Sequence, residues 1–277
     1  MFENVYVGVK DHEAGRDALA LARQLVSPDG DLTLVSVFVA VNTPPPDGGA
    51  GWEVGERRRA LARLARLRDD SHVGAELSWL QARSAAAGLS EVVRGHGDLL
   101  VVGASRRDDY ERVFVGDDAR EVLEHAPSAV AVAPAGYAAP AGALRVIGVA
   151  YDGSPAGEQA LDAGRRLASA RAAELSVFQV VPEPIRVRDP WHVEAEIAAG
   201  VERAGRRLAE LEGVTTHAVS GDPADELARL AASVDLMVLG PHTRRPVDRL
   251  AGGSVAQRLA DTIPCPLLVL GPPATGS

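Results

Sequence analysis

The feature that most constrains this chain is an internal repeat. The segment GDLLVVGAS (97–105) is similar to VDLMVLGPH (234–242), which lies 137 residues further on. The same spacing aligns Gly103 with Gly240, Gly116 with Gly253, and Pro127 with Pro264. Because several matches follow in the same order with equal gaps, the chain is predicted to contain two copies of one folding unit.

The boundary between the two copies is visible in the composition. The stretch APAGYAAPAGAL (133–144) is uncharged and rich in alanine, proline and glycine, as is typical of a short linker. We therefore predict one domain over residues 1–138 and a second domain over residues 139–277.

Short apolar runs rich in β-branched residues alternate with stretches of helical periodicity in each copy. Predicted strands include 4–9, 32–41, 99–103 and 129–133, and in the second copy about 145–150, 175–181, 214–219, 235–240 and 266–270. Leucines at 61, 64 and 67 predict an exposed amphipathic helix. Strands that are apolar throughout are typical of a parallel sheet covered on both faces, so we predict an α/β fold with two tandem, doubly wound, five-stranded parallel sheets.

Composition and charge exclude several classes of protein. The net charge of −9 disfavours a broad surface for nucleic acid or anionic lipid. With one cysteine the chain forms no internal disulfide, and its longest apolar runs have the length of strands and not of membrane spans. The N-terminus lacks the basic and apolar regions of a signal peptide, so we expect a soluble, cytoplasmic protein.

Two segments of the second copy are candidates for a binding site, because open parallel sheets bind ligands beyond the carboxyl ends of their strands. Asp152 and Gly153 follow the first strand, and the segment GPHTRRPVDRLAGGS (240–254) follows the fourth. Gly240 permits close approach of main-chain amides to an anion, and Gly253-Ser254 precedes a helix whose N-terminus favours a negative charge. Three arginines and one aspartate give the segment a net charge of +2.

These residues resemble those of the universal stress protein family in a tandem two-domain form, over nearly the whole chain. ATP-binding members carry Gly-x-x-Gly, nine residues, then Gly-Ser or Gly-Thr, followed by a helix and a final strand after Pro-Cys-Pro. Here Gly240 and Gly253-Ser254 have that spacing, Pro264-Cys265-Pro266 follows, and Thr243 stands where the second glycine is expected. In this position a β-branched residue costs about 1–3 kcal/mol if the main chain needs positive φ.

The resemblance implies a fold and a ligand. The fold is that of the adenine-nucleotide α-hydrolase-like group with strand order 3-2-1-4-5, and the ligand is ATP with Mg²⁺ in the C-terminal domain. The implied binding residues are Asp152, Val180 (with Val181 as the alternative), Gly240, His242, Thr243, Arg244, Gly253, Ser254 and Val255. The family also pairs domains through the last strand, which implies pairing of 129–133 with 266–270 and, in addition, homodimerisation.

The first copy departs from the motif. Its equivalent segment, GASRRDDYERVFVGDD (103–118), has Arg106 in place of the second glycine, Asp117 in place of Ser or Thr, and a net charge of −2. An acid about 4 Å from a phosphate costs roughly 4 kcal/mol at an effective dielectric constant near 20. Asp11 follows the first strand, as Asp152 does in the second copy. We expect a degenerate nucleotide site in this domain.

A different interpretation of the second site remains open. Ser254 and Gln257 fit a capping box, which alone accounts for the serine, and arginines in a polar loop are commonly solvated. The alternative function is therefore a protein-interaction module on the same fold that binds no nucleotide.

Motifs for catalysis are not apparent in the sequence. It has neither a dinucleotide fingerprint nor a P-loop, and its histidines lack metal-ligand spacing. Cys265 lies between two prolines before an apolar strand and is expected to be buried and inert. We predict a regulator or sensor in the stress response and not an enzyme, with at most slow, incidental ATP hydrolysis; an enzyme of the wider adenine-nucleotide group is the least favoured class.

Overall fold

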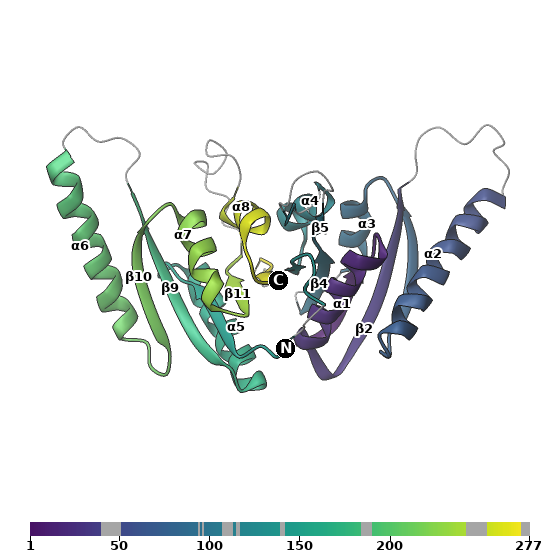
Figure 1. The fold of residues 1–277 in the computed structure, drawn as a ribbon, viewed down its shortest axis with the longest axis horizontal. Coiled ribbons are helices and arrows are strands. Elements are labelled where there is room, and N and C mark those ends of the chain that lie inside the picture. Colours follow the sequence, from purple (N-terminus) through teal and green to yellow (C-terminus); the bar gives the residue numbers. More distant parts are fainter. Residues whose placement is uncertain are drawn as a thin grey trace, which may run out of the picture. The chain divides into compact units, whose positions relative to one another are not determined.

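The computed structural model of the protein describes most of the chain. The described residues are 1–39, 51–93, 95, 97–106, 113–114, 117–138, 142–183, 190–241 and 254–272. The chain divides into two compact units: unit 1 comprises residues 1–142 and 271–277, and unit 2 spans residues 143–270. Figure 1 shows the course of the chain through both. The predicted boundary after residue 138 adjoins 139–141, which lie outside the described residues, and it stays a prediction.

Unit 1 contains one parallel sheet with the order β3-β2-β1-β4-β7. Its main elements are β1 (Phe2–Gly8), α1 (His12–Leu25), β2 (Val26–Val39), α2 (Gly51–Asp70), β3 (Glu76–Ala82), α3 (Ala85–Val92), β4 (Asp98–Gly103), α4 (Asp117–His125) and β7 (Ala129–Ala133). The short strands β5 (Ser105–Arg106) and β6 (Val113–Phe114) form a separate antiparallel pair.

Unit 2 repeats this topology with the order β10-β9-β8-β11-β12. Its elements are β8 (Val146–Ala150), α5 (Pro155–Arg171), β9 (Glu174–Pro182), α6 (Pro190–Ala209), β10 (Thr215–Gly221), α7 (Pro223–Leu230), a 3-10 turn η1 (Ala231–Ser233), β11 (Leu236–Leu239), α8 (Val255–Thr262) and β12 (Leu267–Val269). Numbered within its own unit, each sheet has the order 3-2-1-4-5. The predicted fold class and strand order are confirmed.

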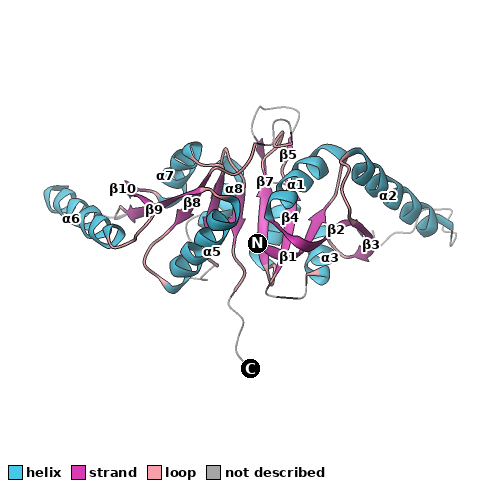
Figure 2. Ribbon diagram, turned by 90° about the horizontal axis from the view of Figure 1, so that it is seen from below, coloured by secondary structure: helices cyan, strands magenta, loops and turns pink. Residues whose placement is uncertain are grey.

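The core of each unit lies against the central strands. Every residue of β11, and every residue of β4 except the half-buried Gly103, is buried, and helices lie on both sides of each sheet (Figure 2). This explains why the strands are continuous apolar runs in the sequence.

Helix α2 is more buried than the sequence suggests. Leu64 and Leu67 are 0% and 1% exposed, because α2 packs against β2 and β3. The prediction of an amphipathic helix is correct, but its description as exposed applies only to the arginine-rich face.

Part of the predicted linker is attached to unit 1. The carboxylate of Asp17, 5% exposed on α1, accepts hydrogen bonds from the amides of Gly136 and Ala138, both of 2.7 Å. The Gln24 amide donates to the Tyr137 hydroxyl at 2.8 Å. Residues 136–138 therefore belong to the packed structure of unit 1.

A close approach between strand and helix requires glycine in both units. A Cβ atom at Gly103 would lie 2.1 Å from the Ala14 carbonyl oxygen, and one at Gly240 would lie 2.2 Å from that of Ala156. Since main-chain atoms cannot move aside as a flexible side chain can, only glycine lets the end of the fourth strand pack against the first helix of its unit.

We predict that Gly103→Ala destabilises unit 1 by about 1–3 kcal/mol, because the added methyl group overlaps the Ala14 carbonyl. Urea unfolding, analysed for separate transitions of the two units, measures this. The control is Gly205→Ala on α6, where a Cβ atom meets nothing within 4 Å and helix propensity favours alanine by up to about 1 kcal/mol. An unchanged unit 1 midpoint in Gly103→Ala would contradict the packing argument.

Candidate functional site

Strand β9 extends beyond its neighbour β8 at the carboxyl edge of the unit 2 sheet. The β8–β9 ladder ends with Ala150 opposite Phe178, and the Tyr151 amide donates to the Phe178 carbonyl at 2.8 Å. β9 stays paired with β10 as far as Pro182. Because main-chain groups alternate in direction along a strand, the N–H and C=O of Val180 point to the same side as those of Phe178, where β8 has ended.

The turn between β8 and α5 is held by its own polar groups. The Asp152 carboxylate accepts a hydrogen bond from the Ser154 amide at 2.9 Å, and the Ser154 hydroxyl caps α5 by accepting from the Gly157 amide. Gly153 has φ of +76°, a conformation that favours glycine. Asp152 thus has a structural role in the turn while its exposed carboxylate faces the carboxyl edge of the sheet.

The N-terminus of α8 leaves two main-chain amides without acceptors. Ser254 and Gln257 form a complete capping box: the serine amide donates to the glutamine Oε1 at 3.0 Å, and the glutamine amide donates to the serine hydroxyl at 3.3 Å. The amides of Val255 and Ala256 have no acceptor within the described chain. The first turn of a helix presents such amides to solvent or to a ligand.

These features line one cavity of about 640 Å³ in unit 2. Five of the predicted binding residues meet there: Asp152, Val180, Gly240, Ser254 and Val255. The other four, His242, Thr243, Arg244 and Gly253, lie outside the described residues. At Gly240 the need for glycine comes from packing on Ala156, and approach of an anion to its amide stays a prediction.

Sequence reasoning missed three polar residues of this cavity. Arg203 and Arg207 lie one turn apart on α6, and both line it. Arg203 has no hydrogen bond or ion pair within the described chain, whereas Arg207 donates to the Asp152 carbonyl at 3.1 Å. Gln179 is 8% exposed, and its Oε1 has no hydrogen-bond partner among the described residues. The available signal for Gln179 was that it is the single polar residue within the apolar run VFQVV (177–181).

The described lining carries more positive than negative charge. Its charged members are the Asp152 carboxylate and the guanidinium groups of Arg203 and Arg207. Tyr151 also lines the cavity, but its hydroxyl donates to Glu158, and burial together with that bond raises the pKa of Tyr151 to about 12. A net charge of +1 and the N-terminus of α8 favour an anionic ligand.

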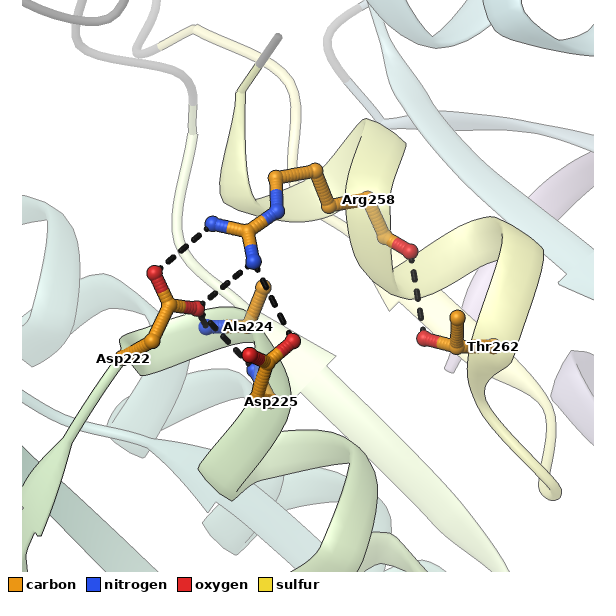
Figure 3. Close-up of polar contacts among 5 residues, drawn as sticks. All are labelled: Asp222, Ala224, Asp225, Arg258 and Thr262. Atoms are coloured by element: carbon orange, nitrogen blue, oxygen red, sulfur yellow. Dashed lines mark hydrogen bonds and ion pairs between the residues drawn. The ribbon is translucent and has the colours of Figure 1, made fainter. Parts of the chain in front are cut away.

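Helices α7 and α8, which contribute one wall, are held together by an arginine (Figure 3). Arg258 on α8 donates to Asp222 at 2.8 Å and to Asp225 at 3.1 Å. Asp222 also caps α7 by accepting from the amides of Ala224 and Asp225. The hydrogen bond from Arg258 is the main reason that the pKa of Asp222 is lowered.

Strand register corrects one comparison between the units. Val7 pairs with Val101 and Val149 pairs with Val238, while Val9 and Tyr151 make equivalent hydrogen bonds to the second strand. Val9 therefore corresponds to Tyr151, and the next residue, Lys10, corresponds to Asp152. The sequence comparison, which matched Asp11 with Asp152, was wrong by one residue. Asp11 instead caps α1 by accepting from the Ala14 amide at 2.8 Å.

Other candidate chemistries find no support among the described residues. Cys265 is 6% exposed, which confirms that it is buried, and burial raises the pKa of its thiol to about 12, which disfavours the reactive thiolate. The described part of the chain contains no group of three or more His, Cys, Asp or Glu side chains able to hold a metal ion. In that same part, no helix combines the length and the apolar character that crossing a membrane requires.

Comparison with known proteins assigns the family. The model of the universal stress protein family matches residues 1–134 and, a second time, residues 143–271. The chain belongs to the universal stress protein family. This confirms the resemblance drawn from the motifs, and the double match agrees with the internal repeat.

Two individual universal stress proteins are similar to this chain at modest sequence identity. One from Mycobacterium tuberculosis is 27% identical over 242 residues, covering 82% of this chain and 80% of that protein. One from Thermus aquaticus is 31% identical over 136 residues, covering 46% of this chain and 98% of that protein. The crystal structure of a universal stress protein from Archaeoglobus fulgidus aligns with a TM-score of 0.67 at 16% identity, covering 97% of this chain and 98% of that one. That likeness shows the fold.

We predict that Arg258→Gln lowers the stability of unit 2 by about 0.5–1 kcal/mol at neutral pH, since the ion pair is partly exposed. The lowered pKa of Asp222 means that the pair stabilises the fold above the ordinary carboxyl pKa and that this contribution is lost as the pH falls through the lowered value. Urea unfolding at neutral and acidic pH measures both effects.

The control for this prediction is Arg229→Gln, which removes an arginine that pairs with Glu226 within α7 alone. If acid destabilises Arg258→Gln by as much as it destabilises the wild type, the bond between α7 and α8 has no role in stability.

Proposed function

We propose that this universal stress protein binds an adenine nucleotide, ATP with Mg²⁺, in the cavity of unit 2 and acts as a regulator or sensor in the stress response. The observation that carries the proposal is the pair of amides at Val255 and Ala256, which have no acceptor among the described residues and line a cavity of about 640 Å³. Helix N-termini of this kind bind phosphate groups.

The order of the strands arranges the ligand across the sheet edge. Val180 on β9 offers main-chain groups to the base, and Asp152 after β8 offers a carboxylate to ribose hydroxyls. Gly240 after β11, with Val255 and Ala256 on α8, receives the phosphates. Since β9, β8 and β11 are neighbours in that order, base, ribose and phosphates lie over successive strands. The volume suits a small-molecule site.

The segment between Gly240 and Ser254 contributes to the same proposal from its sequence. We assign His242, Arg244 and the amides around Gly253 to the phosphates, with Thr243 in place of the family's second glycine. Permanent charge and several donors make arginine suitable for phosphate oxygens.

Magnesium fits this site as a partner of the phosphates. Mg²⁺ neutralises phosphate charge and prefers one or two carboxylates together with phosphate oxygens and water. The one carboxylate among the described lining residues, Asp152, is assigned to the ribose, so phosphate oxygens and water would be the main ligands of the metal. The protein's own groups bind and orient the nucleotide, and phosphate oxygens would supply most of the protein-independent ligands of the metal.

Rapid hydrolysis is not part of the proposed function. The Tyr151 hydroxyl is held by Glu158, and its raised pKa keeps it protonated at neutral pH. Asp152 follows β8 on the ribose side, whereas α8 holds the phosphates. Any turnover of ATP is therefore slow and incidental.

The remaining parts of the proposal concern assembly and location. We propose that the last strands, 129–133 and 266–270, pair within the chain and that the protein also forms homodimers in the cytoplasm. The net charge of −9 argues against nucleic acid as a partner.

We predict that Val255→Pro weakens ATP binding by about 10- to 100-fold, the expected effect of losing one hydrogen bond to a charged group. Proline suits the first position of a helix, and Ser254 already has the extended conformation (φ −69°, ψ 158°) that proline requires of its predecessor. The variant thus removes an N–H without breaking α8. Isothermal titration calorimetry measures the affinity.

Val255→Ala is the matched control, because it shortens the same side chain and keeps the amide. Equal affinities of Val255→Pro and Val255→Ala for ATP would contradict a role for this amide.

A second variant tests the loop. Gly253→Asp adds a negative charge directly before Ser254, the residue that corresponds to Asp117 of unit 1, and we expect this charge to abolish ATP binding by repulsion. If the wild type and Gly253→Asp bind ATP equally, or neither binds it, the nucleotide proposal fails. Absence of binding in both would leave the protein-interaction module, which the complete capping box of Ser254 also permits.

A further inference from the structure

Unit 1 has a cavity of its own at the carboxyl ends of β1 and β2. It measures about 270 Å³, and its lining is largely apolar, with Val9, Val35, Val37, Leu89 and Val102 among its members. Because its lining residues belong to unit 1 alone, its ligand is a question separate from nucleotide binding in unit 2.

The charged side chains among the described lining residues of this cavity are both positive. They are Lys10, the only lysine of the chain, and Arg63 on α2. Arg63 has no hydrogen bond or ion pair within the described chain. Lys10 occupies the position that Asp152 has in unit 2. The charge beside the first strand is therefore reversed between the two units.

The helix that precedes the last strand differs in charge in the opposite sense, since its start is acidic in unit 1 and uncharged in unit 2. Where α8 follows Gly253-Ser254, the corresponding helix of unit 1 begins at Asp117-Asp118. In the sequence, the start of this helix thus carries two negative charges, which disfavour a phosphate group as a ligand. A triphosphate is thus disfavoured, while a single negative charge near Lys10 and Arg63 is favoured.

Polar main-chain groups also face this cavity. The β1–β2 ladder ends with Gly8 opposite Val35, the Val9 amide donates to the Val35 carbonyl at 2.8 Å, and β2 stays paired with β3 as far as Val39. By the alternation along β2, the N–H and C=O of Val37 point to the side where β1 has ended. The cavity can therefore hold a polar group as well as an apolar body.

We propose that the cavity of unit 1 binds a small organic monocarboxylate. The apolar body of the ligand lies among the valines and Leu89, and its carboxylate is held by the Lys10 ammonium and the Arg63 guanidinium. Arginine suits a carboxylate because its planar group donates two parallel hydrogen bonds. The unit thus keeps the family's binding position but selects a ligand with one negative charge and no phosphate.

The test uses the full chain and calorimetric titration with three acids, butyrate, benzoate and 3-phenylpropionate, and with the uncharged 3-phenylpropionamide. We expect at least one acid to bind, and 3-phenylpropionate to bind at least about tenfold more tightly than its amide. Lys10→Gln and Arg63→Gln should each weaken binding of the acids by about 10- to 100-fold, as expected for a lost hydrogen bond to a charged group. Lys10→Arg, which keeps the charge, should retain most of it.

Arg59→Gln is the matched control, since Arg59 lies on the same helix but pairs with Glu56 and does not line the cavity. It should bind the acids as the wild type does. Thermal unfolding of each variant distinguishes lost binding from lost folding. The proposal is overturned if no acid binds at millimolar concentration, if acid and amide bind equally, or if folded Lys10→Gln and Arg63→Gln bind like the wild type.

Discussion

The early end of the first strand in each sheet is the constraint on which the rest of the structure depends. In unit 2, β8 stops pairing at Ala150 while β9 continues along β10 to Pro182. This difference leaves the main chain of Val180 facing an opening. The turn at Asp152 and the N-terminus of α8 line the same opening, because the first helix turns back from the strand edge and the fourth strand leads towards α8. A longer β8 would fill the cavity with its own main chain. The position of the site is therefore determined by the strand topology, and the side chains determine only its chemistry.

The architecture was predictable from the sequence, whereas several details of the site were not. Apolar runs and helical spacing repeat twice, and that pattern specifies the parallel sheets without knowledge of any contact. The correspondence of Lys10 with Asp152 was hidden, because a one-residue offset in a turn is visible only from strand register. Arg203 and Arg207 could not be selected among the arginines of α6, since the rotation of the helix decides which of them face the cavity. The residues from His242 to Gly253 lie outside the described part, so their contributions stay predictions.

In both units, the residues required for packing are different from the residues expected to recognise a ligand. Gly103 and Gly240 satisfy the same steric requirement against Ala14 and Ala156, and neither depends on a ligand. The groups that differ include Lys10 and Asp152, which line the two cavities. In the sequence, Asp117 stands where the second copy has Ser254. Changes there alter the charge that a ligand meets while the buried strands and their helices are unaffected. In the proposed function, the positively charged cavity of unit 2 holds the nucleotide.

The most direct test of the central claim is to follow the main-chain amide resonances of the ¹⁵N-labelled, deuterated protein during titration with ATP and Mg²⁺. The account predicts that the amides of Val255 and Ala256 shift most strongly and saturate together with Val180, because phosphate and base then bind in one cavity. The assignment of the nucleotide site to unit 2 is wrong if ATP binds and the resonances of these three amides do not shift. It is also wrong if ATP shifts only amide resonances of unit 1.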